Sequence, residues 1–460
     1  MPALSYTVPA EQGTGVYTGC EVIVLPTGPV PTSAKRGAAS PDSHAKSPVA
    51  RTAPKDLGPQ TVRVLLLRHA DVYAPEPLGI QDLIAVAGRI VALAPRLERP
   101  RLPSSVPLEI FDLHGAKLVP GFVDQHVHLA GGGGEGGFLN RTPPVPFTDL
   151  ALAGTTTAVG LLGTDGVARS VQELYATVQG VNAWGLTAHM YTGAYELPTR
   201  TITGSVRTDI MLIDRVLGTG EIALSDDRSS HPSEDDLAHL AAETRVGGLL
   251  SGKAGVLHLH MGSGRRGLTP VLDLIERRDL PVTMFVPTHV NRRMPLLEQA
   301  LELVRRDGHA DLTSDFGPTQ ASPHTVSAHD GLKWLLDHGA DPAHLTFSSD
   351  AGGSAPIFDA RGELVDIGVG RPNALWRTVR RAHLECGIPL ATALSLITEN
   401  PSRLLKLPRK GRIAPGVDAD LVTLREDLTV DRVWAQGVLF VQGGEPVRSA
   451  PFAARAGGLA

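Results

Sequence analysis

The stretch PGFVDQHVHLAGGGGE, from Pro120 to Glu135, runs from an apolar, β-branched segment through two histidines and four glycines to a single glutamate. Residues i and i+2 of a β-strand face the same side, so His126 and His128 are expected to point together into one space. Chemistry in α/β barrels collects where the parallel strands end. The stretch therefore predicts a strand that delivers two imidazoles to a site, followed by a glycine-rich loop that ends in Glu135.

Seven further strand candidates follow this one, and segments with helical periodicity separate several of them. Residues 233–250 and 291–306 show that periodicity. Eight strands that alternate with helices indicate an α/β fold, a (β/α)8 TIM-like barrel, which we expect over residues 119–404. The strand candidates, in chain order, are GFVDQHVHL, TTTAVGLLG, LTAHMYTGA, EIALSD, VLHLHMG, VTMFVPTHV, ADLTSD and LTFSSD.

Short β-rich runs, broken by glycine and proline, precede and follow the predicted barrel. We expect residues 61–118 and 405–460 to pair into one small β-sandwich domain built from both ends of the chain. The segment 26–56 is rich in Pro, Ser, Ala and Lys, so it cannot bury enough apolar surface to offset its ordering entropy. Residues 1–60 are therefore predicted to be a mobile or poorly structured extension, in which GCEVIVLP at 19–26 could form one short strand.

The composition argues against several classes of protein. The chain has 460 residues, a hydrophobic fraction of 42% and a net charge of −5, which gives no sign of nucleic acid or an anionic membrane as partner. No apolar run approaches the ~20 residues of a membrane span, and no basic segment leads into an apolar one at the N-terminus. The two cysteines, Cys20 and Cys386, form no disulfide framework. These features predict a cytoplasmic protein.

Histidine and carboxylate side chains recur at the predicted strand ends. Imidazole and carboxylate together are the ligand set of Zn²⁺ and its divalent neighbours. A single strand histidine is more often a hydrogen-bonded structural residue, and Asp226 and His258 are interpreted as structural residues outside the ligand set. The coincidence of four histidines and an aspartate at four strand ends favours a metal site. Its candidate ligands are His126, His128, His260, His289 and Asp350, with Glu221 at the start of the fourth strand.

Several of these motifs resemble one protein family. LVPGFVDQHVH at residues 118–128, the later histidines, SSD and the tail at residues 399–424 look like the amidohydrolase superfamily. Within it, loop motifs that differ between amidohydrolases resemble the bacterial isoaspartyl dipeptidase family, over roughly Val62 to the end of the chain. These loop motifs are HVHLAGGGGEGG, GLLGTDG, TGAYELPTRTITGSV, HMG, PTHVNR and SSDAGGSAP.

The resemblance implies a binuclear zinc peptidase that hydrolyses the isopeptide bond of β-aspartyl dipeptides through attack by a metal-activated hydroxide. Two Zn²⁺ per chain are expected, one held by His126 and His128 and the other by His260 and His289. Asp350 would bind the first metal and act as the general base. Members of the family form large homo-oligomers, and an octamer is the assembly that the resemblance implies.

The resemblance also implies how a substrate with a free amine and two carboxylates would be bound. Tyr195 would donate a hydrogen bond to the scissile carbonyl oxygen as that oxygen becomes an oxyanion. Glu135 would pair with the substrate ammonium, and the glycine run before it would let the backbone approach the metals and the substrate closely. The carboxylates would be bound by Arg228 and Arg292, by Thr164 and by Ser354.

The fourth strand departs from the family pattern. The family places there a lysine that reacts with CO₂, and the resulting carbamate bridges two metals. Aligning DRVLGTGEIALSDDR, residues 214–228, puts Glu221 at the lysine position with one extra residue just before it. Glu221 could bridge the metals directly if the strand shifts inward, which Gly218 and Gly220 would permit. The other interpretations are an enzyme with one metal and a non-catalytic homologue, and retention of the other ligands argues against the latter.

Two other functions stay open at this point. A related amidohydrolase that acts on another N-acyl amino acid or on a cyclic amide would keep the metals and Asp350. It would not need Glu135 together with both arginines, so their presence favours the dipeptidase. A structural barrel that binds no metal is the alternative of a different class.

Overall fold

The predicted extension, residues 1–60, lies outside the part of the chain that can be described, and so does Cys20. The description rests on a computed structural model, and it covers residues 62–314, 316–318, 324–358, 364–448 and 450.

The chain divides into two compact units. One comprises residues 1–62 and 98–106, and the other comprises residues 63–97 and 107–460. The described residues of the first unit contain no helix or strand. All helices and strands of the described chain therefore belong to the second unit.

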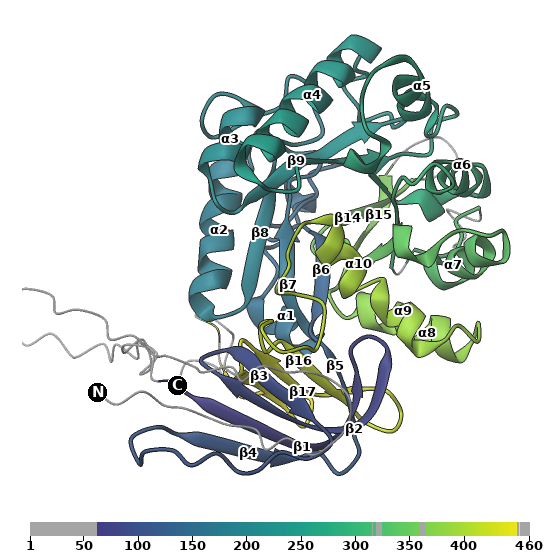
Figure 1. The fold of residues 1–460 in the computed structure, drawn as a ribbon. Helices are drawn as coiled ribbons and strands as arrows, with labels where there is room; N and C mark the ends of the chain where they lie inside the picture. The colour runs from purple at the N-terminus through teal and green to yellow at the C-terminus, as the bar shows by residue number, and fades with distance from the viewer. Residues whose placement is uncertain (1–61, 315, 319–323, 359–363, 449, 451–460) are drawn as a thin grey trace, which may run out of the picture. The chain divides into compact units, whose positions relative to one another are not determined.

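A six-stranded parallel sheet lies at the centre of the second unit (Figure 1), and its strand order is β11-β10-β9-β8-β7-β6. Nearly every residue of these strands is buried, which explains why the sequence shows apolar runs and not a strict alternation. The strands are β6 (Phe122–Val127), β7 (Thr155–Gly160), β8 (Thr187–Thr192), β9 (Val216–Leu224), β10 (Val256–Met261) and β11 (Phe285–Thr288).

The prediction that the fourth strand begins at Glu221 is wrong. Strand β9 begins at Val216, so Glu221 lies inside the strand and not at its start. The residues before Glu221 read VLGTG, and two glycines in so short a run conceal the strand pattern.

Two more parallel strands, β12 (Ala310–Thr313) and β13 (Leu345–Ser348), pair with each other. Val127 of β6 forms a parallel bridge with Ala351, just after β13, and the His128 amide donates a hydrogen bond to the Ala351 carbonyl at 2.8 Å. The eight strands predicted from the sequence are thus all present and parallel. Their arrangement is consistent with a TIM-like barrel and is that of a mixed α/β protein.

A single buried carboxylate joins the two parallel sheets. Asp311 of β12 accepts hydrogen bonds of 2.5–2.7 Å from Gln125 of β6, Thr288 of β11, and Thr346 and Ser348 of β13. Burial raises the pKa of Asp311, and the donors around it act in the opposite direction. Side chains from four strands therefore meet at one point inside the fold.

Helices follow most of the parallel strands and cover their outer side (Figure 1). Helix α4 begins after Ser233, which forms a capping box with Asp236, and it ends at Gly252 with a φ of 71°. The helices are α1 (Phe147–Leu152), α2 (Val171–Trp184), α3 (Val206–Leu212), α4 (Glu234–Ser251), α5 (Thr269–Arg277), α6 (Met294–Val304), α7 (Ala328–Asp337), α8 (Ala374–Leu384), α9 (Leu390–Ser395) and α10 (Glu399–Leu404).

A second, nine-stranded sheet combines both flanks of the parallel strands. Its order is β19-β18-β17-β16-β5-β1-β2-β3, with β4 beside β1, and β5 pairs antiparallel with β16. The strands are β1 (Val64–Tyr73), β2 (Pro77–Val86), β3 (Arg89–Ala94), β4 (Leu108–Asp112), β5 (Lys117–Pro120), β16 (Leu421–Leu424), β17 (Val430–Ala435), β18 (Val438–Gln442) and β19 (Glu445–Pro446). Strands from both flanks thus pair in one connected sheet, and this pairing does not confirm a sandwich.

A buried ammonium group connects the two sheet systems. Lys410 Nζ lies 2.6 Å from Asp420 Oδ2, 3.0 Å from Asp418 Oδ2 and 2.7 Å from Thr187 Oγ1. Thr187 opens β8 of the parallel sheet, whereas Asp418 and Asp420 immediately precede β16. This ion pair network fixes the segment that enters β16 against the start of β8.

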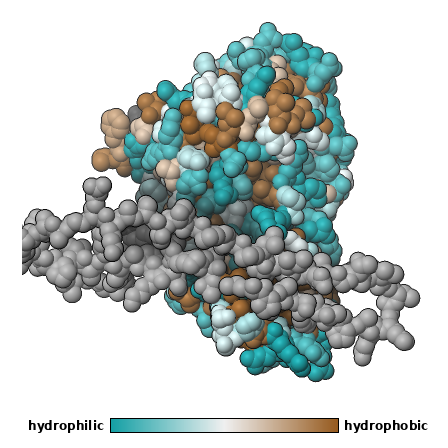
Figure 2. Space-filling view, turned by 60° about the vertical axis from the view of Figure 1, so that its left-hand side comes forward, coloured by the Kyte–Doolittle hydropathy of each residue, from teal (hydrophilic) through white to brown (hydrophobic). Residues whose placement is uncertain are grey.

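No helix in the described part of the chain is long and apolar enough to cross a membrane. The face in Figure 2 is largely hydrophilic, and its hydrophobic residues gather in separate groups.

Candidate metal centre

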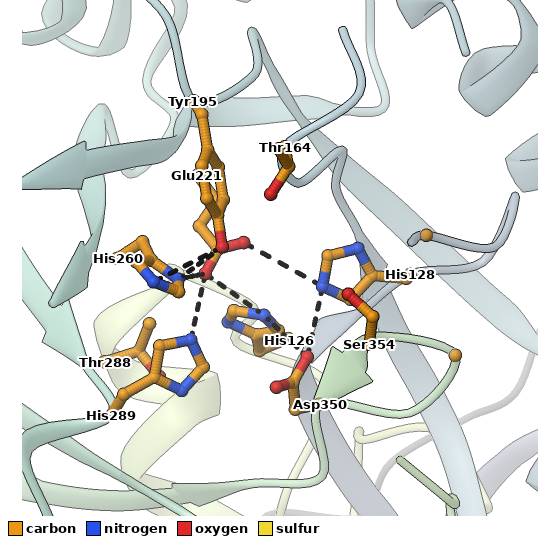
Figure 3. A network of polar contacts seen from close by, with 12 residues as sticks. His126, His128, Thr164, Tyr195, Glu221, His260, Thr288, His289, Asp350 and Ser354 are labelled. Atoms are coloured by element: carbon orange, nitrogen blue, oxygen red, sulfur yellow. Dashed lines mark hydrogen bonds and ion pairs between the residues drawn. The ribbon is translucent and has the colours of Figure 1, made fainter. Parts of the chain in front are cut away.

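The six predicted ligands converge at the carboxyl-end side of the parallel strands (Figure 3). Strands β6 and β10 carry one histidine each, β9 carries the glutamate, and the other three follow β6, β11 and β13 directly or within two residues. All six are buried. They are His126, His128, Glu221, His260, His289 and Asp350.

The Glu221 carboxylate lies among the four histidines. Its Oε2 is 2.8 Å from His260 Nδ1 and 3.0 Å from His289 Nε2. The same oxygen is 3.5 Å from His126 Nε2, and the other oxygen, Oε1, is 3.8 Å from His128 Nε2. One short side chain thus reaches both histidine pairs.

Asp350 closes the other side of the centre. Its Oδ1 lies 3.1 Å from His128 Nε2 and 3.4 Å from His126 Nε2. Within the described residues, ligand atoms fall into three groups in which all members lie within 4.8 Å of one another. The groups are His126–His128–Glu221, His126–His289–Asp350 and Glu221–His260–His289.

A β-bulge explains how the short Glu221 side chain reaches this position. Leu257 of β10 pairs with Thr219 of β9, whereas Leu259 pairs with Ile222, so Gly220 and Glu221 together oppose one residue, His258. The bulge agrees with the extra residue that the sequence places before Glu221. A Cβ on Gly220 would lie 2.6 Å from the His258 carbonyl oxygen, so only glycine allows β9 to approach β10 so closely here.

The charges of the centre depend on one another. Burial alone would raise the pKa of Glu221, but the imidazoles of His126 and His260 hold it well below its ordinary range. Burial likewise opposes a charge on His126, but the Glu221 and Asp350 carboxylates raise its pKa to about 9. Burial lowers the pKa of His289 to about 3 in spite of its contact with Glu221. Two ionised carboxylates in a buried space require positive charge next to them.

The donor set fits a metal. His126 Nε2 and Glu221 Oε1 are buried polar atoms without a hydrogen-bond partner among the described residues, and each belongs to a ligand group. Glycines leave the space open: a Cβ on Gly163 would lie 2.8 Å from His128 Cε1, and a Cβ on Gly353 would overlap Asp350 Oδ1. Imidazole with carboxylate is a donor set that suits Zn²⁺ and similar ions.

The two residues interpreted as structural, Asp226 and His258, contact ligand histidines. Asp226 Oδ2 lies 3.1 Å from His260 Nε2, and His258 Nε2 lies 2.8 Å from His126 Nδ1. Neither belongs to a ligand group. These contacts with ligand histidines could not be predicted from the sequence.

The glycine run folds into an ordered turn that carries Glu135. Gly133 and Arg141 form an antiparallel bridge, and the Gly132 amide donates to Thr142 Oγ1 at 2.6 Å. Arg169 is buried beneath this turn and donates to the carbonyls of Ala130, Gly132 and Thr142. Within the run, Gly132 lies nearest to a predicted ligand, since an added Cβ there would be 3.4 Å from His128 Nδ1. Gly131 and Gly133 instead pack against the returning half of the turn.

Three predicted substrate-binding residues surround Glu135. Arg228 Nη1 lies 2.9 Å from Glu135 Oε1, Thr164 donates to the same oxygen at 3.0 Å, and Ser354 donates to Oε2 at 3.1 Å. Burial raises the pKa of Glu135, but the backbone N–H of Glu135 itself and Arg228 outweigh it, so the pKa is lowered and the carboxylate stays ionised.

The two arginines have different surroundings. Arg228 also pairs with Asp226, through Nε to Oδ1 and Nη2 to Oδ2, both at 2.9 Å. Arg292 makes no ion pair with a carboxylate of the described chain, and its guanidinium lies over the Phe316 ring at 5.2 Å. Of the two arginines, only Arg228 is therefore paired with carboxylates among the described residues.

Tyr195 lies at the same centre. Its hydroxyl is 2.7 Å from His260 Nδ1, the nitrogen that also faces Glu221. Burial and the Glu221 carboxylate raise the pKa of Tyr195 well above its ordinary value, so the hydroxyl keeps its proton as a donor.

An α/β fold with buried histidines and carboxylates at the strand ends defines a metal-dependent hydrolase of the amidohydrolase type, and sequence comparison agrees. Residues 325–440 match the sequence model of the Amidohydrolase family. The chain is 24% identical to a dihydroorotase of Elusimicrobium minutum over 77% of its own length and 87% of that protein. It is also 24% identical to an allantoinase of Deinococcus radiodurans, over 80% of its own length and 89% of that protein.

The structural comparison is more specific. A beta-aspartyl dipeptidase of Fervidobacterium islandicum AW-1, solved in complex with the dipeptide beta-Asp-Leu, is 39% identical and superimposes with a TM-score of 0.78. The match covers 85% of this chain and 100% of that one. A D-hydantoinase of Thermus, at 15% identity and a TM-score of 0.61, shares the fold alone. The chain belongs to the amidohydrolase family, and within it the chain is similar to beta-aspartyl dipeptidase.

Proposed function

We propose that the protein is a zinc-dependent dipeptidase that hydrolyses the isopeptide bond of β-aspartyl dipeptides. The observation that carries the proposal is the position of Glu135, held between Arg228, Thr164 and Ser354 at the edge of the ligand cluster. Such a carboxylate suits a substrate with a free ammonium group, which a β-aspartyl dipeptide carries on its Cα, one carbon further from the cleaved carbonyl than in an α-linked dipeptide. The similarity to a beta-aspartyl dipeptidase at 39% identity supports the same substrate class.

We further propose that two metal ions are held per chain and that Glu221 bridges them. The groups His126–His128–Glu221 and Glu221–His260–His289 have only Glu221 in common, which supports this assignment. Asp350 would complete the first group from its position 3.1 Å from His128. When bound, the metals supply Lewis acidity and lower the pKa of water.

The protein's own groups would position the substrate and move protons. Asp350 is ionised, because its contacts with His126 and His128 outweigh its burial and lower its pKa, so it can accept a proton from the attacking water. The same carboxyl group would then pass that proton to the leaving amine. Tyr195, which keeps its own proton, would donate a hydrogen bond to the carbonyl oxygen of the scissile bond.

The three charged groups of the substrate, its ammonium and its two carboxylates, would each have a partner in the site. Its ammonium would pair with Glu135, and Arg292 would take a carboxylate, since Arg292 has no carboxylate partner among the described residues. Arg228 already pairs with Glu135 and Asp226, so its role in this proposal is to hold Glu135 in place and to contact the second carboxylate with one edge. Thr164 and Ser354, whose hydroxyls donate to Glu135, would also contact the bound substrate carboxylates.

The finer features of the fold form part of the proposal. The bridge between Val127 and Ala351 supports closure of the eight parallel strands into a (β/α)8 barrel. The length of the nine-stranded sheet supports the proposal that this sheet folds back on itself and forms a sandwich. The octameric assembly and the cytoplasmic location stay predictions from the sequence.

A second candidate is an amidohydrolase that acts on another N-acyl amino acid or a cyclic amide. Dihydroorotase, allantoinase and adenine deaminase among the 23–24% identical relatives favour it. Hydrolysis of β-Asp-Leu and of α-Asp-Leu, with zinc counted in the same sample, distinguishes the two candidates. The dipeptidase predicts cleavage of the β-linked dipeptide alone. A protein with two metals that leaves β-Asp-Leu intact would contradict the dipeptidase and favour the second candidate.

A further inference from the structure

His258 is a fully buried histidine of β10 that belongs to none of the ligand groups of the described chain. It faces the interior together with His260, because one residue separates them on the strand. Its ring stacks on the Tyr191 ring of β8, with centroids 5.0 Å apart and planes at 15°. Its Nε2 lies 2.8 Å from Nδ1 of His126. This contact joins two imidazoles inside the fold.

The two ring nitrogens of His126 have different surroundings. Nε2 points into the centre, 3.5 Å from Glu221 Oε2 and 3.4 Å from Asp350 Oδ1. Nδ1 points to His258. A neutral imidazole carries one N–H, so a lone pair free for a metal at Nε2 requires the proton at Nδ1. That proton in turn needs an acceptor, and His258 Nε2 is the atom within reach.

We propose that His258 is a positioning residue, which accepts the Nδ1 proton of His126 and so directs the Nε2 lone pair of His126 to the metal. The inference deepens the proposed function and rests on its metal-binding part. His258 then carries its own proton on Nδ1, a buried atom without a hydrogen-bond partner among the described residues. Histidines that bind metals generally have such a partner, most often a carboxylate or a carbonyl. An imidazole provides the acceptor without a third negative charge beside Glu221 and Asp350.

The bulge in β9 holds His258 in place. Gly220 and Glu221 both lie opposite His258, and a Cβ on Gly220 would be 2.7 Å from the His258 Cβ. The glycine that lets Glu221 enter the centre therefore also lets β9 pack closely against His258. On the other side, Tyr191 covers the face of the imidazole ring. Gly220 and Tyr191, which are not ligands themselves, thus confine His258 on two sides.

The test compares His258→Phe with His258→Gln. Phenylalanine keeps a flat ring on Tyr191 but has no acceptor, whereas the glutamine carbonyl can still accept from His126. Zinc affinity is measured without substrate, by competition with a chromophoric chelator, and the melting temperature of the metal-free protein reports folding. We expect His258→Phe to weaken the site that contains His126 by about 10- to 100-fold. We expect His258→Gln to lie closer to the unchanged protein.

A matched control is His189→Phe. His189 is a strand histidine of β8 that makes no contact with the ligand groups among the described residues, so its replacement should leave zinc affinity unchanged. Unchanged zinc affinity of a folded His258→Phe would overturn the proposal. If that variant does not fold, His258→Gln and His258→Met are compared, and equal affinities overturn it. The readout needs no dipeptide, so a failure of the proposed substrate class appears separately, as two bound zinc ions without cleavage of β-Asp-Leu.

Discussion

At the scale of single residues, Glu221 decides how the centre is held together. Its carboxylate is close to the backbone, yet it lies 2.8 Å from His260 and 3.0 Å from His289, at a bulge of β9. A carboxylate carries the same single negative charge as a carbamate. The centre can therefore keep its charge without any reaction with CO₂.

The first prediction concerns that charge. Glu221→Gln keeps the shape of the side chain but removes the charge that holds two cations close together. Metal content measured by elemental analysis should fall towards one zinc per chain, and turnover of β-Asp-Leu should fall by orders of magnitude. Two zinc ions bound in a fully active Glu221→Gln variant would show that Glu221 does not bridge.

A companion variant tests the length of the side chain. Glu221→Lys restores the residue type of the related enzymes, but on a strand whose bulge suits a shorter side chain. Added bicarbonate should therefore restore activity only in part. The unchanged protein should regain full activity after zinc reconstitution in degassed, bicarbonate-free buffer. Poor recovery there would contradict a direct carboxylate bridge.

The second prediction concerns Glu135. An acetyl group on the amine of β-Asp-Leu removes the substrate partner that we propose for the half-buried Glu135 carboxylate, which keeps its contacts with Arg228, Thr164 and Ser354. By comparison with broken charge pairs, the loss should be about 2–5 kcal/mol in transition-state binding, measured as kcat/KM. Equal kcat/KM values for free and acetylated dipeptide would exclude the role given to Glu135.

Most residues of the centre could be predicted because strand ends are recognisable in the sequence. His126, His128, His260, His289 and Asp350 each follow an apolar run, and parallel strands bring such ends together. Which other strand residues contact these ligands could not be predicted. The contact depends on the lateral register of neighbouring strands, and the sequence of one strand does not contain that register.

At the scale of elements, the turn that follows β6 is more ordered than a run of four glycines indicates. Its two halves are joined by hydrogen bonds, and Arg169 binds three of its carbonyls from below. These contacts come from residues distant in sequence, so local composition could not reveal them. The order of the turn matters because it places Glu135.

The third prediction tests that support. Arg169→Met keeps much of the buried volume but removes the donors to the turn, so Glu135 should lose its fixed position. Because small displacements of binding groups are costly, kcat/KM for β-Asp-Leu should fall roughly 10- to 100-fold. Zinc content should stay unchanged, since no ligand is lost.

Arg277→Met serves as the control, because Arg277 pairs with Glu234 at an exposed site. It should leave kcat/KM nearly unchanged. Loss of zinc from Arg169→Met, or unchanged kinetics, would contradict the positioning role of Arg169.

The elements themselves differ in how well the sequence predicts them. The eight parallel strands are buried runs of four to nine residues and could be predicted, whereas the true start of β9 could not, because glycines interrupt it. The flanking strands could also be predicted, from their short β-rich runs. Their joining into one connected sheet is a long-range property, in which β5 near the first third of the chain pairs with β16 near its end.

At the scale of the whole molecule, Lys410 joins the two sheet systems, and the fourth prediction concerns its removal. Lys410→Met leaves Asp418 and Asp420 buried without their cation, since both lie within 3.0 Å of the ammonium. Loss of one partner of a buried ion pair costs about 3–5 kcal/mol. The free energy of unfolding, from urea denaturation at neutral pH, should fall by that amount.

Lys333→Met provides the comparison, because Lys333 pairs with Asp337 on an exposed helix face. It should change the free energy of unfolding by less than about 1 kcal/mol. Equal effects of the two variants would show that the buried network does not stabilise the fold.

The pairing of β5 with β16 also has a consequence for synthesis on the ribosome. Val119 pairs with Val422, and all eight parallel strands are made between them. At a synthesis rate of about 5–20 residues per second, roughly 15–60 s pass between the synthesis of β5 and the synthesis of β16. During that time its edge is open to other chains, which is the situation in which strands associate wrongly. The nascent protein thus passes through a period in which a chaperone would have to shield the open edge of β5.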